Sequence, residues 1–415
     1  AQWVVRGNHH DAWVNGAEDP TSGMVAVMEE ARALAELLKQ GWKPKRTIIY
    51  CAWDAEEQGL IGSTEWAEAH ADELKQKAVI YINSDSNGRG YLGVGGSHTL
   101  EKFINGVARD IEDPEKKISV WKRSQLRRIS TARTPEERTE ARQRSDWRIG
   151  ALGSGSDYTA YLDHLGIASM NLGYGGEDGG GIYHSIYDDF YWYTHFSDTS
   201  FSYGRTLAQT AGTAVIRLAD ADLLPYDFKA LAETVQRYVD ELKKLLKNMQ
   251  DEIRERNKQL EEGVFSATSD PRKTFIPPPR EEVPPHLNFA PLENACDGLN
   301  RIAERYDRAI KKIREGGNKK LADVTVRGLN QKLIQSERKL THADGLPGRP
   351  WFKHLIYAPG AYTGYGVKTI PGVREAVEQK KWKEAESEIV RVAKVLEDEA
   401  SLIESAATDL EKVSP

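Results

Sequence analysis

The sequence predicts an α/β domain over residues 1–224, followed by an all-α helical domain over residues 225–415. Two observations support this prediction. Up to about Leu224, short β-type runs alternate with helix-type segments, which is the rhythm of an α/β layer fold. From Asp227 onward, apolar residues recur every three or four positions along highly charged segments, which is typical of amphipathic helices.

The predicted strands of the first domain are short apolar runs, and they cover residues 3–6, 46–53, 79–83 and 167–172. Helical spacing of apolar residues predicts a helix from Met24 to Leu38, which Gly41 ends, and another over residues 64–77. The stretch 122–148 is rich in Arg, Glu and Ser. We expect it to be a partly helical, solvated surface insertion, and a functional basic patch is the alternative.

The predicted second domain contains three helical patterns, over residues 231–253, 299–313 and 382–410. A proline-rich stretch over residues 277–291 separates the first two patterns. Because proline cannot continue a helix, we interpret this stretch as a loop between helices.

Composition excludes several classes of protein. The 415 residues include 57 Lys and Arg against 63 Asp and Glu, a formal net charge of −6, which argues against a nucleic-acid binder. No stretch approaches the roughly 18 apolar residues of a membrane span. Two cysteines, Cys51 and Cys296, are too few for a disulfide framework and leave the compartment undecided. The chain opens directly on a strand-like run, so we expect it to be a fragment of a longer protein.

Acidic residues and histidines follow the predicted strands. They occur in the segments 7–11, 53–57, 83–86 and 183–185, with Asp19 eight residues after Asp11. In open α/β sheets the active site gathers at the carboxyl ends of the strands. Each segment alone also fits a structural role, as surface residues, a helix start, a turn cap or a loop histidine.

Taken together, these residues match the requirements of a metal site. Two histidines with Asp19, Glu57 and Asp85 are a suitable donor set for two zinc ions that share one carboxylate. Glu56 remains as a free carboxylate. His9 is expected to bind metal while Asp11 accepts its other N–H.

Several strings carry a specific resemblance. Asp54 to Trp66 reads DAEEQGLIGSTEW, residues 165–169 read LGIAS and residues 182–187 read IYHSIY. In the helical part, residues 345–350 read GLPGRP and residues 354–359 read HLIYAP. The sequence resembles the co-catalytic zinc peptidase family that contains glutamate carboxypeptidase II and the transferrin receptor, over its protease core and dimerisation domain. The resemblance implies a mixed sheet with helices on both faces. The family's upstream protease segment and apical domain have no counterpart here.

The resemblance also implies residue roles and two zinc ions per chain. One zinc would be held by His9, Asp19 and Asp85, and the other by Asp19, Glu57 and His184. The implied catalytic residues are Glu56 as general base, Tyr183 as hydrogen-bond donor to the oxyanion, and Asp11 as the group that orients His9. The implied substrate-binding residues are Gly155, Ser156, Asn171 and Tyr365.

Departures from the family pattern bear on the substrate. Gly364 stands where glutamate-selective members carry a lysine, and Asn171 and Gly173 stand where they carry two arginines. A buried carboxylate without its charged partner costs about 3–5 kcal/mol. We therefore expect no strict preference for acidic residues.

The resulting hypothesis is a binuclear zinc exopeptidase that acts on small peptides and dimerises through its helical domain. The alternatives are an inactive receptor-like or structural relative, and a zinc hydrolase or acyl transferase that acts on non-peptide amides. The choice between aminopeptidase and carboxypeptidase stays open. Relatives are commonly anchored or exported, which favours an extracytoplasmic location, with any anchor in a segment before Ala1.

Overall fold

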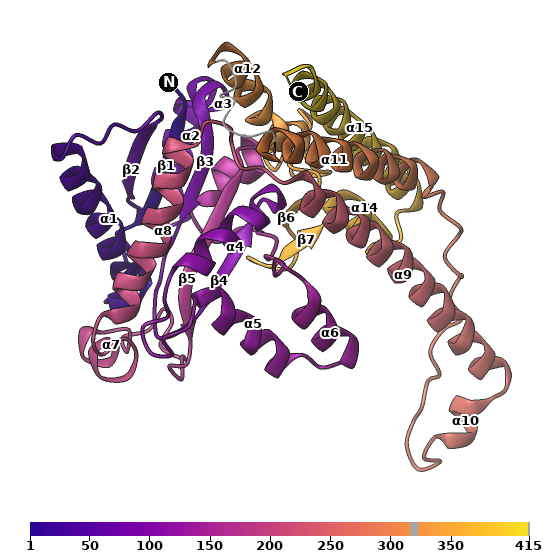
Figure 1. Ribbon diagram of the computed structural model, residues 1–415. Coiled ribbons are helices and arrows are strands. Elements are labelled where there is room, and N and C mark those ends of the chain that lie inside the picture. Colours follow the sequence, from indigo (N-terminus) through magenta and orange to yellow (C-terminus); the bar gives the residue numbers. More distant parts are fainter. Residues whose placement is uncertain (316–322, 414–415) are drawn as a thin grey trace.

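A computed structural model describes residues 1–315 and 323–413 of the chain (Figure 1). Its main sheet has five strands in the order β2-β1-β3-β5-β4. The first four strands in this order run parallel, and β4 pairs antiparallel with β5, so the sheet is mixed as predicted. The strands are β1 (Trp3–His9), β2 (Thr47–Trp53), β3 (Ala78–Asn83), β4 (Gly90–Gly96) and β5 (Ser169–Gly176).

Helices cover both faces of this sheet. The first region contains η1 (Ala17–Thr21), α1 (Ser22–Lys39), α2 (Ile61–Ala69), α3 (Ala71–Lys77), η2 (His98–Leu100), α4 (Glu101–Asp110), α5 (Val120–Thr131), α6 (Pro135–Gln143), η3 (Ala160–His164), α7 (Phe190–Phe196) and α8 (Ser202–Asp220). On one face, Tyr174 of β5 bonds Thr210 of α8, which packs beside α1. On the other face, Tyr81 of β3 stacks on Tyr161 of η3 at 4.1 Å.

The second region is mainly helical. It contains α9 (Phe228–Glu261), α10 (Val264–Thr268), α11 (Ala290–Glu315), α12 (Asp323–Leu333), α13 (Ser336–Lys339), α14 (Pro371–Glu378) and α15 (Trp382–Val413). The helix α11 packs against both α9 and α15 (Figure 1). None of the helices in the described part of the chain combines the length and apolarity needed to cross a membrane.

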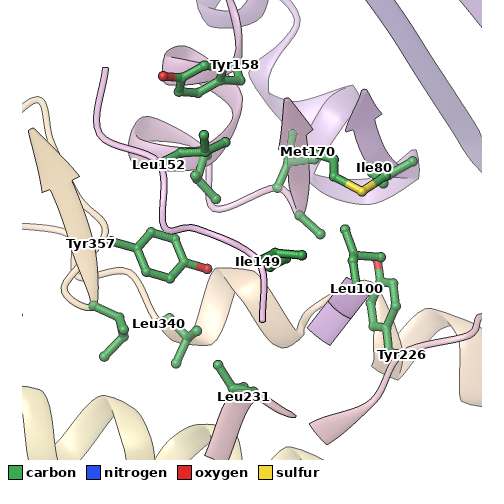
Figure 2. Close-up of a cluster of buried hydrophobic side chains, with 14 of the residues drawn as sticks. Ile80, Leu100, Ile149, Leu152, Tyr158, Met170, Tyr226, Leu231, Leu340 and Tyr357 are labelled. Carbon is green, nitrogen blue, oxygen red and sulfur yellow. The ribbon is translucent and has the colours of Figure 1, made fainter. Parts of the chain in front are cut away.

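One apolar core joins the two regions. Figure 2 shows Ile80 and Met170 of the sheet in the same cluster as Leu231 of α9, Leu340 and Tyr357. The predicted division at residues 224/225 lies between α8 and α9, and it stays a prediction because the buried core is continuous across it.

The structure corrects four details of the sequence prediction. The strand β4 was not expected, since four of its seven residues are glycine and give no β-type pattern. The predicted helix over 64–77 is two helices that meet at His70. The region expected to be all helical also contains an antiparallel strand pair, β6 (Tyr357–Pro359) and β7 (Val367–Thr369). The stretch 122–148 is not wholly solvated, because the side chain of Arg123 is buried between Asp113 and Glu177.

Candidate metal centre and active site

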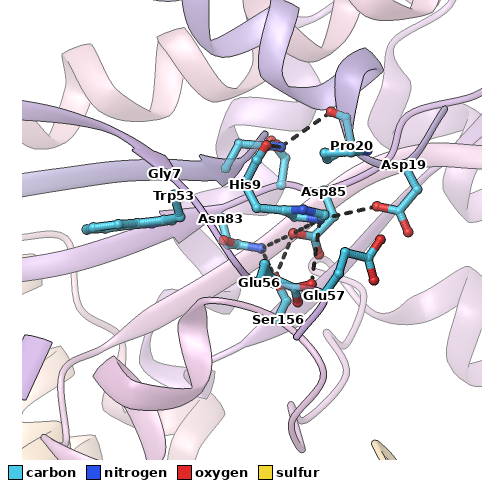
Figure 3. A network of polar contacts seen from close by, with 12 residues as sticks. Gly7, His9, Asp19, Pro20, Trp53, Glu56, Glu57, Asn83, Asp85 and Ser156 are labelled. Atoms are coloured by element: carbon cyan, nitrogen blue, oxygen red, sulfur yellow. Dashed lines mark hydrogen bonds and ion pairs between the residues drawn. The ribbon is translucent and has the colours of Figure 1, made fainter. Parts of the chain in front are cut away.

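The candidate site lies at the carboxyl edge of the sheet, where three neighbouring parallel strands end (Figure 3). His9 is the last residue of β1. Glu56 and Glu57 lie in the turn after β2, and Asp85 follows β3. Because parallel strands end at the same edge, residues about 45 and 75 positions apart in the sequence come together.

The imidazole of His9 is buried, with its two nitrogens in different roles. Nδ1 donates to the main-chain carbonyl of Asp11 at 2.9 Å. Nε2 faces Asp19 Oδ1 at 3.3 Å and Asp85 Oδ1 at 3.8 Å. Burial lowers the pKa of His9, but its contact with Asp19 and the charges of Asp85 and Glu56 outweigh burial and raise the pKa to about 10.

Asp19 lies between the two histidines. Its Oδ1 faces His9 Nε2 at 3.3 Å and its Oδ2 faces His184 Nε2 at 3.7 Å. Oδ1 is buried, and the described residues offer it no hydrogen-bond partner. Glu57 Oε2 lies 3.0 Å from His184 Nε2.

This arrangement fits a bound cation. Two electron-pair donors that face each other at 3.3 Å repel unless a proton or a metal ion lies between them. Ligand atoms about 2.0–2.1 Å from a tetrahedral zinc lie about 3.3–3.4 Å apart, close to the separation of His9 Nε2 and Asp19 Oδ1. Imidazole and carboxylate are also the donor types that zinc accepts in proteins.

Two sets of three donors in the described residues come within 4.8 Å of one another. The first set, of Asp19, Glu57 and His184, coincides with one predicted zinc site. The second set is His9, Glu56 and Glu57. The other predicted trio, His9, Asp19 and Asp85, is not one of these sets, although His9 Nε2 lies within 4 Å of both carboxylates.

Asp11 holds the turn that carries both glutamates. Its two carboxylate oxygens accept hydrogen bonds from the main-chain N–H of Glu56 at 3.0 Å and of Glu57 at 3.1 Å. His9 Nδ1 donates its hydrogen bond to the main-chain carbonyl of Asp11, not to the carboxylate. The Asp11 carboxylate lies 3.5 Å from the same nitrogen. Asp11 therefore supports the site through both its main chain and its side chain.

Two predicted substrate-binding residues lie behind the site. Ser156 Oγ donates to Asp85 Oδ1 at 2.6 Å, and Ser156 is buried. Asn171 accepts from Asn83 Nδ2 at 3.1 Å, and this same amide also contacts Asp85 at 3.1 Å. Neither Ser156 nor Asn171 is among the residues that line the cleft, and their role in substrate binding stays a prediction. The sequence alone does not show that the side chains of Ser156, in a loop, and Asn171, in β5, turn inward.

The site opens into a cleft of about 530 Å³ that contains the predicted donors and Glu56. Gly155, Tyr183 and Tyr365, for which substrate-binding or catalytic roles are expected, also line it. Gly155 has φ +98°, and a Cβ there would lie within 3 Å of the Tyr365 ring, so glycine is required. His184 also has a left-handed backbone, with φ 54°, and its ring stacks on Tyr183 at 3.7 Å.

The Glu56 carboxylate reaches into the cleft. No donor among the described residues is within hydrogen-bonding distance of it, and His9 Nε2 lies 4.0 Å away. Burial and the charges of Asp85 and Asp157 raise the pKa of Glu56 to about 9, against the opposing effect of His9. The raised pKa shows that this position gives the carboxyl group a high affinity for a proton.

Three contributors were not predicted. Asp188 accepts hydrogen bonds from the main-chain N–H of Glu18 at 2.7 Å and of Asp19 at 3.0 Å, and so positions the main chain that carries the Asp19 carboxylate. Trp351 and Phe352, from the second region, line the cleft. Loop residues such as these carry no hydrophobic periodicity that would mark them in the sequence. The one local signal is that Asp188 lies shortly after His184.

The fold and the site define a class. A mixed α/β sheet that gathers buried imidazole and carboxylate donors at its carboxyl edge, beside one free glutamate, is typical of metal-dependent hydrolases. Residues 1–200 match the family model "Peptidase family M28", and residues 287–404 match "Transferrin receptor-like dimerisation domain". Residues 1–200 therefore belong to peptidase family M28 and residues 287–404 to the transferrin receptor-like dimerisation domain, which confirms the family predicted from the motifs.

Curated relatives agree with this assignment. The chain is 33% identical over 411 residues to the probable glutamate carboxypeptidase LAMP1 of Arabidopsis thaliana, covering 97% of this chain and 51% of the relative. It is 34% identical over 381 residues to a probable glutamate carboxypeptidase of Arthroderma benhamiae, covering 90% and 45%. It is 28% identical over 427 residues to the aminopeptidase NAALADL1 of Rattus norvegicus, covering 99% and 51%. The chain thus spans about half the length of these relatives.

Proposed function

We propose that the protein is a zinc-dependent exopeptidase that hydrolyses small peptides, with two zinc ions per chain. The observation that carries this proposal is the position of Asp19, whose two carboxylate oxygens face His9 and His184 separately. A carboxylate shared in this way is what a two-metal site requires.

The residues that would hold the metal are the five that the family resemblance implies, and the donor contacts support this assignment. His9, Asp19 and Asp85 would bind one zinc, and Asp19, Glu57 and His184 the other. Zinc at such a site supplies Lewis-acid polarisation of the scissile carbonyl and of the attacking water. Asp11, Asp188 and Ser156 would orient the ligands through the hydrogen bonds described above.

Glu56 would carry the proton. Its carboxylate faces the cleft without a protein donor, so its lone pairs are available to take a proton from the attacking water. The same group would then return that proton to the departing amine. Tyr183, beside His184 in the cleft, would donate a hydrogen bond to the oxygen on which negative charge develops.

The names of the relatives include both carboxypeptidases and an aminopeptidase, so the end of the peptide that is cleaved stays open. An inactive relative is not favoured, because every predicted ligand position and Glu56 hold competent residues. We also propose that the chain forms a homodimer through the region after Asp227, which contains the dimerisation-domain match.

The test is hydrolysis of a peptide panel by zinc-loaded protein, with amino-terminal and carboxy-terminal release measured separately. Glu56→Gln is the matched variant, since it keeps the size of the side chain and removes its basicity. We expect hydrolysis by the wild type that Glu56→Gln reduces. Zinc-loaded wild type that cleaves no peptide would contradict the proposal.

A further inference from the structure

We propose that Trp351 and Phe352 form a specificity wall that selects substrates with a bulky apolar or aromatic side chain next to the scissile bond. This inference rests on the proposed peptidase function and adds the substrate class. It concerns the wall of the cleft that the second region contributes, not the metal donors.

The large side chains that line the cleft are of two chemical kinds, metal-donor or acidic groups and apolar or aromatic groups. Apart from the predicted metal donors and Glu56, its large side chains are Leu60, Tyr183, Trp351, Phe352 and Tyr365. Among the described residues that line the cleft, none is Lys or Arg. A glutamate side chain that enters would lose water without gaining a cationic partner from this wall, whereas an apolar side chain gains by leaving water.

The indole of Trp351 is held in one orientation. Its Nε1 donates to Glu68 Oε1 of α2 at 2.6 Å, and its ring stacks on His164 of η3 at 4.7 Å. His164 Nδ1 also donates to the Trp351 carbonyl at 2.8 Å. A large flat side chain fixed at both its ring and its main chain makes a preformed surface, which lowers the entropic cost of binding an apolar group.

Phe352 extends the same surface. Its ring meets that of Trp351 edge to face, with centroids 5.1 Å apart and an interplanar angle of 82°. The guanidinium of Arg349 lies over the Phe352 ring at 5.6 Å and bonds Glu375, so this cation is neutralised by a partner of its own. The two rings thus present apolar area to the cleft without an available charge.

Both residues lie within the dimerisation-domain match, at residues 287–404. The second region therefore completes the cleft of the peptidase region, as well as being the proposed site of dimerisation. The sequence departures at Gly364, Asn171 and Gly173 predict that acidic substrate residues are not strictly preferred. The specificity wall adds a preference for bulky apolar or aromatic side chains.

The experiment measures kcat/KM of the zinc-loaded chain for two dipeptide series, Ala-X and X-Ala, with X as Ala, Gln, Glu, Leu and Phe. In the series that carries X in the cleft, we expect Phe and Leu to exceed Ala and Glu by about tenfold or more. Trp351→Ala and Phe352→Ala should each reduce this advantage several-fold, because they lower the rate for the Phe dipeptide more than the rate for Ala-Ala. Trp351→Phe should restore most of it.

Phe275→Ala is the matched control, because Phe275 is an exposed aromatic residue on the loop after α10, outside the cleft. It should keep the full preference. A second readout is the calorimetric Kd of the Phe and Glu dipeptides for Glu56→Gln, which reports selectivity without turnover, and we expect the Phe dipeptide to bind more tightly.

The outcomes separate the inference from the proposed function. Hydrolysis of all dipeptides with a flat profile, or with Glu ahead of Phe, would overturn the wall and leave the peptidase proposal intact. A Phe preference that survives both alanine variants would also overturn it. Absence of hydrolysis of every dipeptide would instead contradict the peptidase proposal.

Discussion

The guanidinium of Arg6, in the strand that ends at His9, and the carboxylate of Glu30 in α1 form a fully buried ion pair. Nε and Nη2 of Arg6 both contact the carboxylate, at 3.1 and 3.0 Å. Nη2 also donates to Ser84 Oγ at 2.8 Å, next to Asp85. One ion pair therefore ties α1 to the segments that carry two of the proposed zinc ligands.

Removing one member of this pair should destabilise the fold strongly. Glu30→Ala leaves a buried guanidinium without its counter-charge, and we expect a loss of about 3–5 kcal/mol in the free energy of unfolding. Denaturant unfolding measures this loss. The control is Glu29→Ala, which breaks an exposed pair with Arg32 on the same helix and should leave the midpoint nearly unchanged. Equal losses in the free energy of unfolding for the two variants would mean that the buried pair stabilises the fold no more than the exposed pair does.

Ser156 should affect metal binding more than it affects folding. Its hydroxyl donates to Asp85 Oδ1, so Ser156→Ala leaves a proposed ligand less firmly oriented. We expect zinc affinity to fall about 10–100-fold, the usual effect of losing such a supporting bond. Competition with a zinc chelator measures it, with Ser130→Ala on the exposed face of α5 as control. Unchanged affinity would show that Asp85 needs no support from Ser156.

The two neighbouring glutamates should behave differently. Glu56→Gln is expected to keep its zinc and lose about 10²–10⁴ in turnover, because a positioned general base contributes that much. Glu57→Gln should instead lower zinc content. Metal analysis and kinetics on the same preparations separate the two roles, and the reverse pattern would mean that base and ligand are exchanged.

Stability should fall as pH rises through a window set by Glu399. Burial, and secondarily the charge of Glu337, raise the pKa of Glu399 to about 8, against the hydrogen bond from Ser336. The folded state therefore holds a proton that the unfolded state releases above the ordinary glutamate pKa of 4.5. The contribution of Glu399 to the free energy of unfolding is complete below pH 4.5. It declines by up to about 1.4 kcal/mol per pH unit from there until about pH 8.

Glu399→Gln removes this titration, so its free energy of unfolding should exceed that of the wild type at pH 8 by more than at pH 5. Unfolding curves at both pH values measure the difference. If the two proteins differ equally at both pH values, Glu399 is not protonated in the folded state.

The homodimer proposal predicts sedimentation of the chain as a dimer at micromolar concentration, because the region after Asp227 contains long helices and the dimerisation-domain match. A mass that stays monomeric across concentrations would contradict it.

Much of the site was predictable because its signals are local. Each of His9, Asp19, Glu56, Glu57 and Asp85 ends a strand, follows one or lies close to the start of a helix, and parallel strands bring their carboxyl ends together. Inward or outward orientation was not predictable. Ser156 and Asn171 have the polarity of cleft residues, yet each bonds a neighbour behind the site.

Two further features, the strand β4 and the contribution of Trp351 to the cleft, could not be predicted because no local sequence pattern marks them. The glycines of β4 give no pattern, so only pairing with β5 defines that strand. Trp351 reaches the cleft from about 290 residues beyond Glu57, a contact that depends on how the two regions pack and that no local pattern encodes.

The central claim is that Asp19 bridges two zinc ions, and zinc content per chain tests it most directly. Wild-type protein loaded with zinc and freed of excess metal should contain about two zinc ions per chain by elemental analysis. His9→Ala and His184→Ala should each bind less, and Asp19→Ala should lose affinity for both ions. Wild type with a single zinc, or Asp19→Ala with two, would contradict the account.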